Sequence, residues 1–361
     1  GIMASFADNF RTIKAGNAFF VGANTPRGFM SDHRRLLSED EFKKVYIIKG
    51  GSGTGKSTMM RKAAAAAEGA GAVCTYLLCG SDPDSLDGVI MEKGGVRVGI
   101  MDGTAPHTMD PVYAGACGEI VNCGDCWNSA YLEERRTEIS RAVKEKKLCF
   151  ETAYRFLSGA GEVTEMQRET ADRILLRGKM SACIDRLVST LPAKGSGNIS
   201  ERRTLGITMK GVVRLDTFER AKRVITVEDC ADLAPFFADE LAARLAADGR
   251  EAVISRFPTD GIAEIYIPSA DTCVTLMNCE KEAYKNINMR RFADIDEIRN
   301  SRRRRRFLEK CLGAMLDGAR ESLESAAKLH FELEDIYKAS MDFKGLDELG
   351  ERLCRRVCNC F

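Results

Sequence analysis

The chain has 361 residues, of which 44% are hydrophobic and 30% charged, a composition that is typical of folded domains and excludes an intrinsically disordered chain. Its 54 Lys and Arg residues almost balance its 53 Asp and Glu residues, so the formal charge of +1 gives no global field that would recruit nucleic acid or an anionic membrane. No apolar run is long enough to span a membrane and no signal peptide is recognisable, so we expect a cytoplasmic protein without a membrane partner.

The first ordered unit that the pattern predicts is a strand, a glycine-rich loop and a helix, in that order. Residues 45–48 are β-branched or aromatic, and the alanine-rich stretch 59–68 favours a helix that should end near Gly69 or Gly71. Residues 72–78 and 96–102 predict two further strands. Alternating strands and helices indicate an α/β domain with a parallel sheet, and we place a polar loop over residues 81–87.

Long helices are expected next, because residues 128–190 are rich in charge and poor in helix breakers apart from 158–161. We interpret this region as a helical hairpin that completes a first domain, residues 1–190. The Pro-, Gly- and Ser-rich stretch 191–200 is the expected linker to a second domain, residues 201–361, with its own helical tail from about residue 300.

The second domain repeats the plan of the first. Residues 44–48 match 223–227, the first helix matches 237–247, the strand 98–102 matches 274–278, and 153–157 in the helical tail match 319–323. The chain is therefore interpreted as an internal duplication.

The glycine-rich loop has the pattern Gly-x-x-x-x-Gly-Lys-Ser, in which inward-facing backbone N–H groups bind phosphates at a helix N-terminus. Lys56 supplies a positive charge for the β and γ phosphates, and the Ser57 hydroxyl is a ligand for Mg²⁺. We therefore predict a site for ATP or another nucleoside triphosphate with Mg²⁺, formed by Gly50, Gly51, Ser52, Gly53, Thr54, Gly55, Lys56, Ser57 and Thr58.

A carboxylate at the end of a neighbouring strand is the second requirement, and Asp102 ends the predicted strand 96–102. We expect it to hold Mg²⁺ with Ser57, although Asp is also a common turn residue. Gly103 follows directly, where many ATPases have a Glu that orients water. Asp82, Asp84, Asp87 and His107 are the remaining catalytic candidates, with helix-capping, turn or structural roles as the alternatives.

The second half has lost this motif. Residues 228–236, at the place of the glycine loop, contain no glycine and no lysine but three carboxylates. Asn278 stands where we expect the counterpart of Asp102, and an amide is a poorer partner for Mg²⁺. We expect the second half to keep the fold without the site, and to support, cover or regulate the first half.

Two other features invite binding hypotheses. The 14 cysteines are expected to be reduced thiols, and Cys123 with Cys126 forms one paired motif, which is half of what a four-thiolate zinc site needs. Unrelated thiols are the favoured interpretation. The five arginines at 302–306 lack interleaved aromatic residues and have acidic neighbours, so a solvated helix face is favoured over a nucleic-acid contact.

Together these residues resemble a family of bacterial tandem P-loop proteins, largely uncharacterised and labelled ATPase or nucleotide-kinase-like. The resemblance rests on residues 19–22 with Thr25 and Gly28, 49–58, 81–87, 102–107, and a closing helix with His330, Glu334, Tyr337 and 341–343. It implies two P-loop NTPase-like units, each a three-layer α/β/α arrangement with a helical hairpin. Both halves of that family commonly carry a P-loop, and this chain departs from it in the second half.

The function that follows is binding of ATP with Mg²⁺ at the first site alone, with hydrolysis or transfer of a phosphoryl group to a small molecule or nucleotide. Two alternatives remain open at this level: a nucleotide-gated interaction module with little turnover, and a nucleic-acid-associated ATPase that uses the arginine run.

Overall fold

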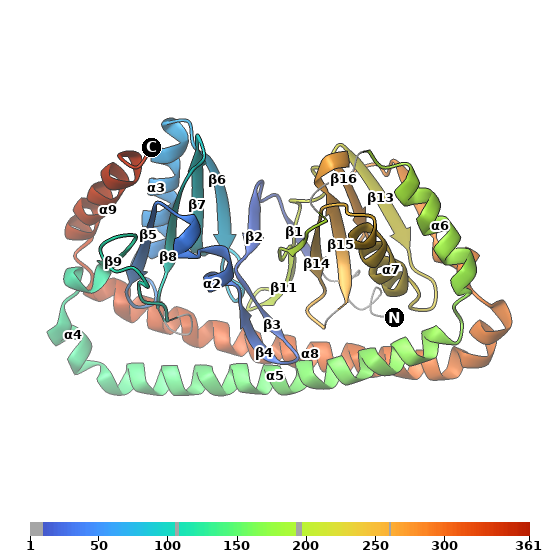
Figure 1. The fold of residues 1–361 in the computed structure, drawn as a ribbon. Helices are drawn as coiled ribbons and strands as arrows, with labels where there is room; N and C mark the ends of the chain where they lie inside the picture. Colours follow the sequence, from blue (N-terminus) through green and yellow to red (C-terminus); the bar gives the residue numbers. More distant parts are fainter. Residues whose placement is uncertain (1–9, 105–107, 193–196, 260) are drawn as a thin grey trace.

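The computed structural model describes residues 10–104, 108–192, 197–259 and 261–361. Two mixed α/β units stand side by side, and a pair of long helices runs beneath both (Figure 1). Within the described residues, no helix combines the length and apolarity needed to cross a membrane.

The first sheet has six strands. Their order is β2 (Ala18–Phe20), β6 (Val73–Leu78), β7 (Leu86–Lys93), β8 (Val96–Asp102), β5 (Lys44–Lys49) and β9 (Gly118–Asn122). β5 pairs in parallel with β8 and β9, whereas β7 runs antiparallel to both β6 and β8. The predicted strands are present, but the sheet is mixed and not all-parallel. The sequence reading missed β7 because Asp87 and Gly88, which are typical turn residues, lie inside it.

Among the described residues, the longer helices cover one face of this sheet. α3 (Lys56–Gly69) packs there with α9 (Phe343–Cys358), burying Met59, Ala63, Leu346 and Leu353 in one cluster. The opposite face is covered by the short α2 (His33–Leu36), by the 3₁₀ helix η1 (Glu39–Glu41) and by irregular segments. The described residues therefore form an α/β unit whose second face carries only short helical segments in place of the full helical layer that we expected.

The second sheet repeats the first strand for strand. Its order is β10 (Ile199–Glu201), β14 (Ala252–Arg256), β15 (Ile262–Ile267), β16 (Thr272–Thr275), β13 (Arg223–Glu228) and β17 (Lys285–Asn288), with β15 as the antiparallel member. α7 (Ala234–Ala247) follows β13 as α3 follows β5, and η3 (Pro268–Ala270) precedes β16. The repeated plan that the sequence predicted is thus visible in the strand order of the two sheets.

One part of the predicted alignment between the halves is wrong. Tyr46 pairs with Ile100 in the first sheet, and the matching Ile225 pairs with Val274 in the second. The buried Leu276, and not Asn278, therefore occupies the position of Asp102. The two-residue error arises because β8 and β16 share no residue that fixes their register in the sequence.

Two β-hairpins meet between the units. β3 (Gly22–Thr25) pairs with β4 (Gly28–Ser31), and β11 (Leu205–Thr208) pairs with β12 (Gly211–Leu215). β1 (Phe10–Ile13) adds to β12 in parallel, so the start of the first half is joined to the second half. The amide of Asn24 donates to the carbonyl of Ile207 at 2.8 Å, which ties the hairpins together.

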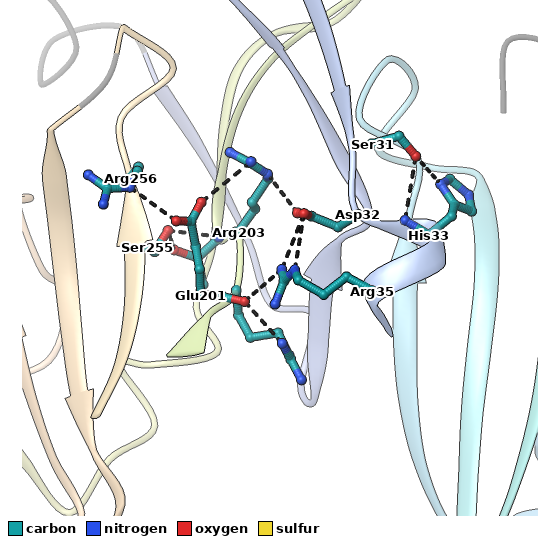
Figure 2. Close-up of polar contacts among 10 residues, drawn as sticks. Ser31, Asp32, His33, Arg35, Glu201, Arg203, Ser255 and Arg256 are labelled. Carbon is teal, nitrogen blue, oxygen red and sulfur yellow. Dashed lines mark hydrogen bonds and ion pairs between the residues drawn. The ribbon is translucent and has the colours of Figure 1, made fainter. Parts of the chain in front are cut away.

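Arg203 of the second unit and Asp32 of the first point toward each other in this junction (Figure 2). Their side chains pair at 2.9 Å and are mostly buried, so solvent screens this pair less than an exposed one. Arg35 also crosses the junction, donating to the carbonyl of Glu201 at 2.9 Å.

The helical tails cross from one unit to the other. After η2 (Cys123–Cys126) and α4 (Ser129–Glu134), α5 (Arg136–Asp172) carries the chain to the second unit, where α6 (Arg177–Ser189) packs on α7. In return, α8 (Ile295–Ser340) follows η4 (Met289–Phe292), runs back beside α5 and delivers α9 to α3 (Figure 1).

The helix-breaking residues at 158–161 do not interrupt the helix, because they lie inside α5 and the turn comes after Asp172. Gly159 faces Met315 of α8 and Gly161 faces Pro26, so these glycines allow close packing. A helix of 37 residues is about 55 Å long, so it reaches the other unit before the chain turns. β10 of the second sheet begins at Ile199, inside the expected linker 191–200, and each half supplies its own last helix, α6 or α9, to the other unit.

Candidate functional site

The glycine loop, residues 50–58, joins β5 to α3 at the carboxyl edge of the first sheet. Gly53 and Gly55 have φ values of +69° and +80°, which side-chain-bearing residues rarely adopt, and Gly55 is the N-cap of α3. The Thr54 hydroxyl closes the loop with a 2.9 Å bond to the carbonyl of Gly51. No described side chain caps α3, so its first N–H groups and the positive end of its dipole remain available to an anion.

Lys56 lies against its own loop and against Asp102. Its ammonium donates to the carbonyl of Gly51 at 2.5 Å and lies 3.5 Å from Oδ2 of Asp102. The parallel pairing of Ile48 with Asp102 explains this contact, because it brings the end of β8 beside the start of the loop. The side chains of Lys56 and Asp102 are 11% and 15% exposed, so their charges interact in a partly desolvated place.

Ser57 and Asp102 fit the hard oxygen ligands that Mg²⁺ prefers. The Ser57 hydroxyl oxygen accepts a 3.0 Å bond from the N–H of Leu86, which fixes it where β7 begins. Asp102 accepts a 2.8 Å bond from the N–H of Thr104 on Oδ1, leaving Oδ2 toward Lys56. A hydroxyl and a carboxylate of this kind complete a magnesium shell only together with phosphate oxygens and water.

The structure brings Asp82 and Asp87 to the same edge. Asp87, 5% exposed, lies inside β7 and not in the predicted loop. Burial, and then the negative charge of Asp102, raise the pKa of the Asp87 carboxyl to about 7. His107 lies outside the described residues.

Lys210, in the loop between β11 and β12, reaches this edge from the second half. Its ammonium lies 2.7 Å from Oδ1 of Asp82 and 2.8 Å from Oδ2 of Asp84, and its hydrogen bond lowers the pKa of Asp84. The sequence reading missed Lys210.

A signal for Lys210 was available in the sequence. The loop Thr25-Pro26-Arg27-Gly28 recurs as Thr208-Met209-Lys210-Gly211, and in each the Thr hydroxyl donates to the Gly carbonyl, at 2.8 and 2.9 Å. Each loop thus presents a cation at the same place. Lys210, the counterpart of Arg27, is the cation that reaches the acidic edge.

The end of α8 and the start of α9 pack directly on the glycine loop. A Cβ at Gly51 would lie 2.6 Å from the ring of Tyr337, and one at Gly53 would lie 2.8 Å from the carbonyl oxygen of Glu334. A Cβ at Gly55 would lie 2.6 Å from Cδ2 of Leu346 in α9. Glycine is therefore required here for packing as well as for backbone conformation.

Charged groups surround this contact. Hydrogen bonds from His330 and Lys338 lower the pKa of Glu334 to about 2 despite its partial burial, so the carboxylate is ionised. Burial lowers the pKa of Lys146 on α5, and the nearby Glu334 and Cys79 oppose that shift. Lys146 is a second cation near the site that the sequence reading missed, because nothing in a long charged helix marks one lysine.

In the second unit, a carboxylate of the corresponding loop occupies the N-terminus of α7. Asp229 accepts bonds from the N–H groups of Asp232, at 3.1 Å, and of Ala234, the first residue of α7, at 2.8 Å. Ala231 and Asp232 keep positive φ values of 60° and 65° without being glycines. A carboxylate therefore lies at the helix N-terminus where the first unit leaves it open.

Cys123 is buried beside Gly50, and burial raises the pKa of its thiol to about 11. Across the described part of the chain, no three His, Cys, Asp or Glu side chains gather in a group that could hold a metal ion. Ser57 and Asp102 together offer one hydroxyl and one carboxylate.

Comparison with known proteins returned no match, whether the chain was scanned against protein-family models or searched against curated proteins and solved structures.

Proposed function

We propose that the first unit is a P-loop NTPase that binds ATP with Mg²⁺ on the glycine loop and hydrolyses it or transfers its γ-phosphoryl group. One observation carries this proposal: Lys56, Ser57 and Asp102 lie together at the uncapped N-terminus of α3. Lysine, hydroxyl and carboxylate at such a terminus are the groups that triphosphate and magnesium require.

In this proposal the Lys56 ammonium leaves its contacts with the Gly51 carbonyl and Asp102 and binds the β and γ phosphates instead. The N–H groups at the start of α3 would bind the same phosphate chain, while Ser57 and Asp102 would hold Mg²⁺, whose charge would offset that of the phosphates. Asp87, with its pKa of about 7, would accept the proton of the attacking water or acceptor hydroxyl. As the new P–O bond forms, the bond to the bridging oxygen breaks and ADP leaves.

A nucleotide-gated module is the second candidate, and the packing of Tyr337 and Glu334 on the loop favours it. These residues belong to α8, which also contacts the second unit, so phosphate binding and the position of α8 are coupled by contact. Gly103 offers no side chain to orient water, which also favours slow turnover.

Phosphate release from ATP separates the candidates. We expect Lys56→Ala to abolish release, whereas Lys62→Ala, the same change on the exposed side of α3, leaves it unaltered. Stimulation by a small-molecule or nucleotide acceptor, with a phosphorylated product, identifies a kinase. Tight binding with release at background identifies the gated module, and stimulation by RNA that weakens with salt identifies the nucleic-acid-associated ATPase. Equal release by wild type and Lys56→Ala would exclude the site.

A further inference from the structure

The second unit has a cavity of about 300 Å³ beside the loop that corresponds to the glycine loop. Asp232 of that loop forms one wall, and the first turns of α8 form the other, with Arg299, Arg302, Arg305, Arg306 and Glu309 among the lining residues. Where the first unit has its glycine loop, the second unit therefore has a cavity lined by arginines from a helix distant in the sequence.

Two of these arginines are occupied by other contacts. Arg299 donates to the carboxylate of Asp296 at 3.1 Å, and Arg305 donates to the carbonyl of Ile298 at 3.3 Å. Arg302 and Arg306 make no hydrogen bond or ion pair with any residue that the structure describes. Four residues apart on one helix, they lie on the same side and about 6 Å apart along its axis.

The cavity is cationic, because four guanidinium groups face the two carboxylates of Asp232 and Glu309. An anion in this cavity cannot bind the N-terminus of α7, because Asp229 already accepts a hydrogen bond from the N–H of Ala234 there. Binding at this place therefore depends on the arginines.

We propose that this cavity binds a small molecule with at least two phosphoryl groups, held by Arg302 and Arg306. Guanidinium groups form bidentate, charge-assisted hydrogen bonds with phosphate, and two of them at this spacing suit successive phosphoryl groups of one chain. The volume matches a small-molecule pocket. A nucleic acid would also use Arg303 and Arg304, which are exposed on the same helix and do not line the cavity.

Calorimetric titration of tripolyphosphate into the full chain carrying Lys56→Ala tests the proposal without relying on the first site. We expect one tripolyphosphate to bind per chain. Adding Arg302→Gln and Arg306→Gln should weaken binding about tenfold or more, the effect of losing one or two charge-assisted hydrogen bonds. The matched control, Arg303→Gln with Arg304→Gln, removes the same charge and should change the affinity less than about threefold.

ATP and tripolyphosphate are compared in the same background: tighter binding of ATP identifies a nucleotide ligand, and equal binding identifies recognition of the phosphate chain alone. Absence of binding would overturn the proposal, as would equal weakening by the two double substitutions. A single-stranded RNA that binds more tightly than tripolyphosphate and depends on Arg303 and Arg304 would replace it with a nucleic-acid surface.

Discussion

Asp87 should make the first unit less stable as the pH rises, and Asp87→Asn should remove that dependence. The native carboxyl keeps its proton up to a pKa of about 7, because it is buried and lies near the charge of Asp102, whereas in the unfolded chain it ionises with the ordinary aspartate pKa of 3.8. Below about pH 4 the Asp87 carboxyl is protonated in both the native and the unfolded state, so it does not change the free energy of unfolding.

Between these values the unfolded chain has released a proton that the native chain still holds. Each pH unit then lowers the free energy of unfolding by about 1.4 kcal/mol, and the loss becomes constant above pH 7. Over the whole window it amounts to at most about 4 kcal/mol. The asparagine variant does not ionise, so its free energy of unfolding does not have this pH dependence. The free energy of unfolding of Asp87→Asn minus that of wild type should therefore be larger at pH 8 than at pH 4, by up to about 4 kcal/mol.

Urea unfolding at pH 4, 6 and 8 measures this difference. Trp127 is the only tryptophan, and its ring lies 5.9 Å from that of Tyr337 beside the glycine loop, so its fluorescence reports on the first unit. Asp84→Asn is the control, because Lys210 lowers the pKa of Asp84 and its loss should not stabilise the protein. A difference between wild type and Asp87→Asn that does not change with pH would refute the reasoning.

Three further substitutions test the packing. Leu353→Ala in α9 should destabilise the unit that contains Trp127 by about 2 to 5 kcal/mol, although Leu353 belongs to the second half of the chain. An unfolding curve, followed by Trp127 fluorescence, that does not change would argue against the exchange of helices between the units. Arg214→Met should cost about 3 to 5 kcal/mol in urea unfolding followed by circular dichroism, because it leaves Glu264 buried without its partner; a neutral result would contradict that pairing. Gly53→Ala should cost about 1 to 3 kcal/mol through its positive φ and the carbonyl of Glu334, whereas Gly69→Ala, with open space around it, should not destabilise the protein.

Local sequence patterns predicted the strand, loop and helix over residues 44–69 because all their determinants are close in the chain. The apolar run at 45–48, the glycines and the alanine-rich helix each favour one conformation. The position of Asp102 beside the glycine loop was also predicted correctly, because β5 and β8 are adjacent in the sheet. These are the residues on which the proposed nucleotide site depends.

The exchange of α6 and α9 between units could not be predicted in the same way. An amphipathic helix shows which face is buried but not which sheet covers it, and the path of α5 and α8 depends on their mutual packing along their whole length. The packing of Glu334 on the glycine loop is therefore a property of tertiary structure alone.

The central claim is tested most directly by the equilibrium binding of ATP, with and without Mg²⁺, to wild type, Lys56→Ala, Lys62→Ala and Asp102→Asn. The account predicts that Lys56→Ala weakens binding about tenfold or more, that Lys62→Ala binds as wild type does, and that Asp102→Asn loses the contribution of Mg²⁺. Equal affinity of wild type and Lys56→Ala for ATP with Mg²⁺ would contradict it.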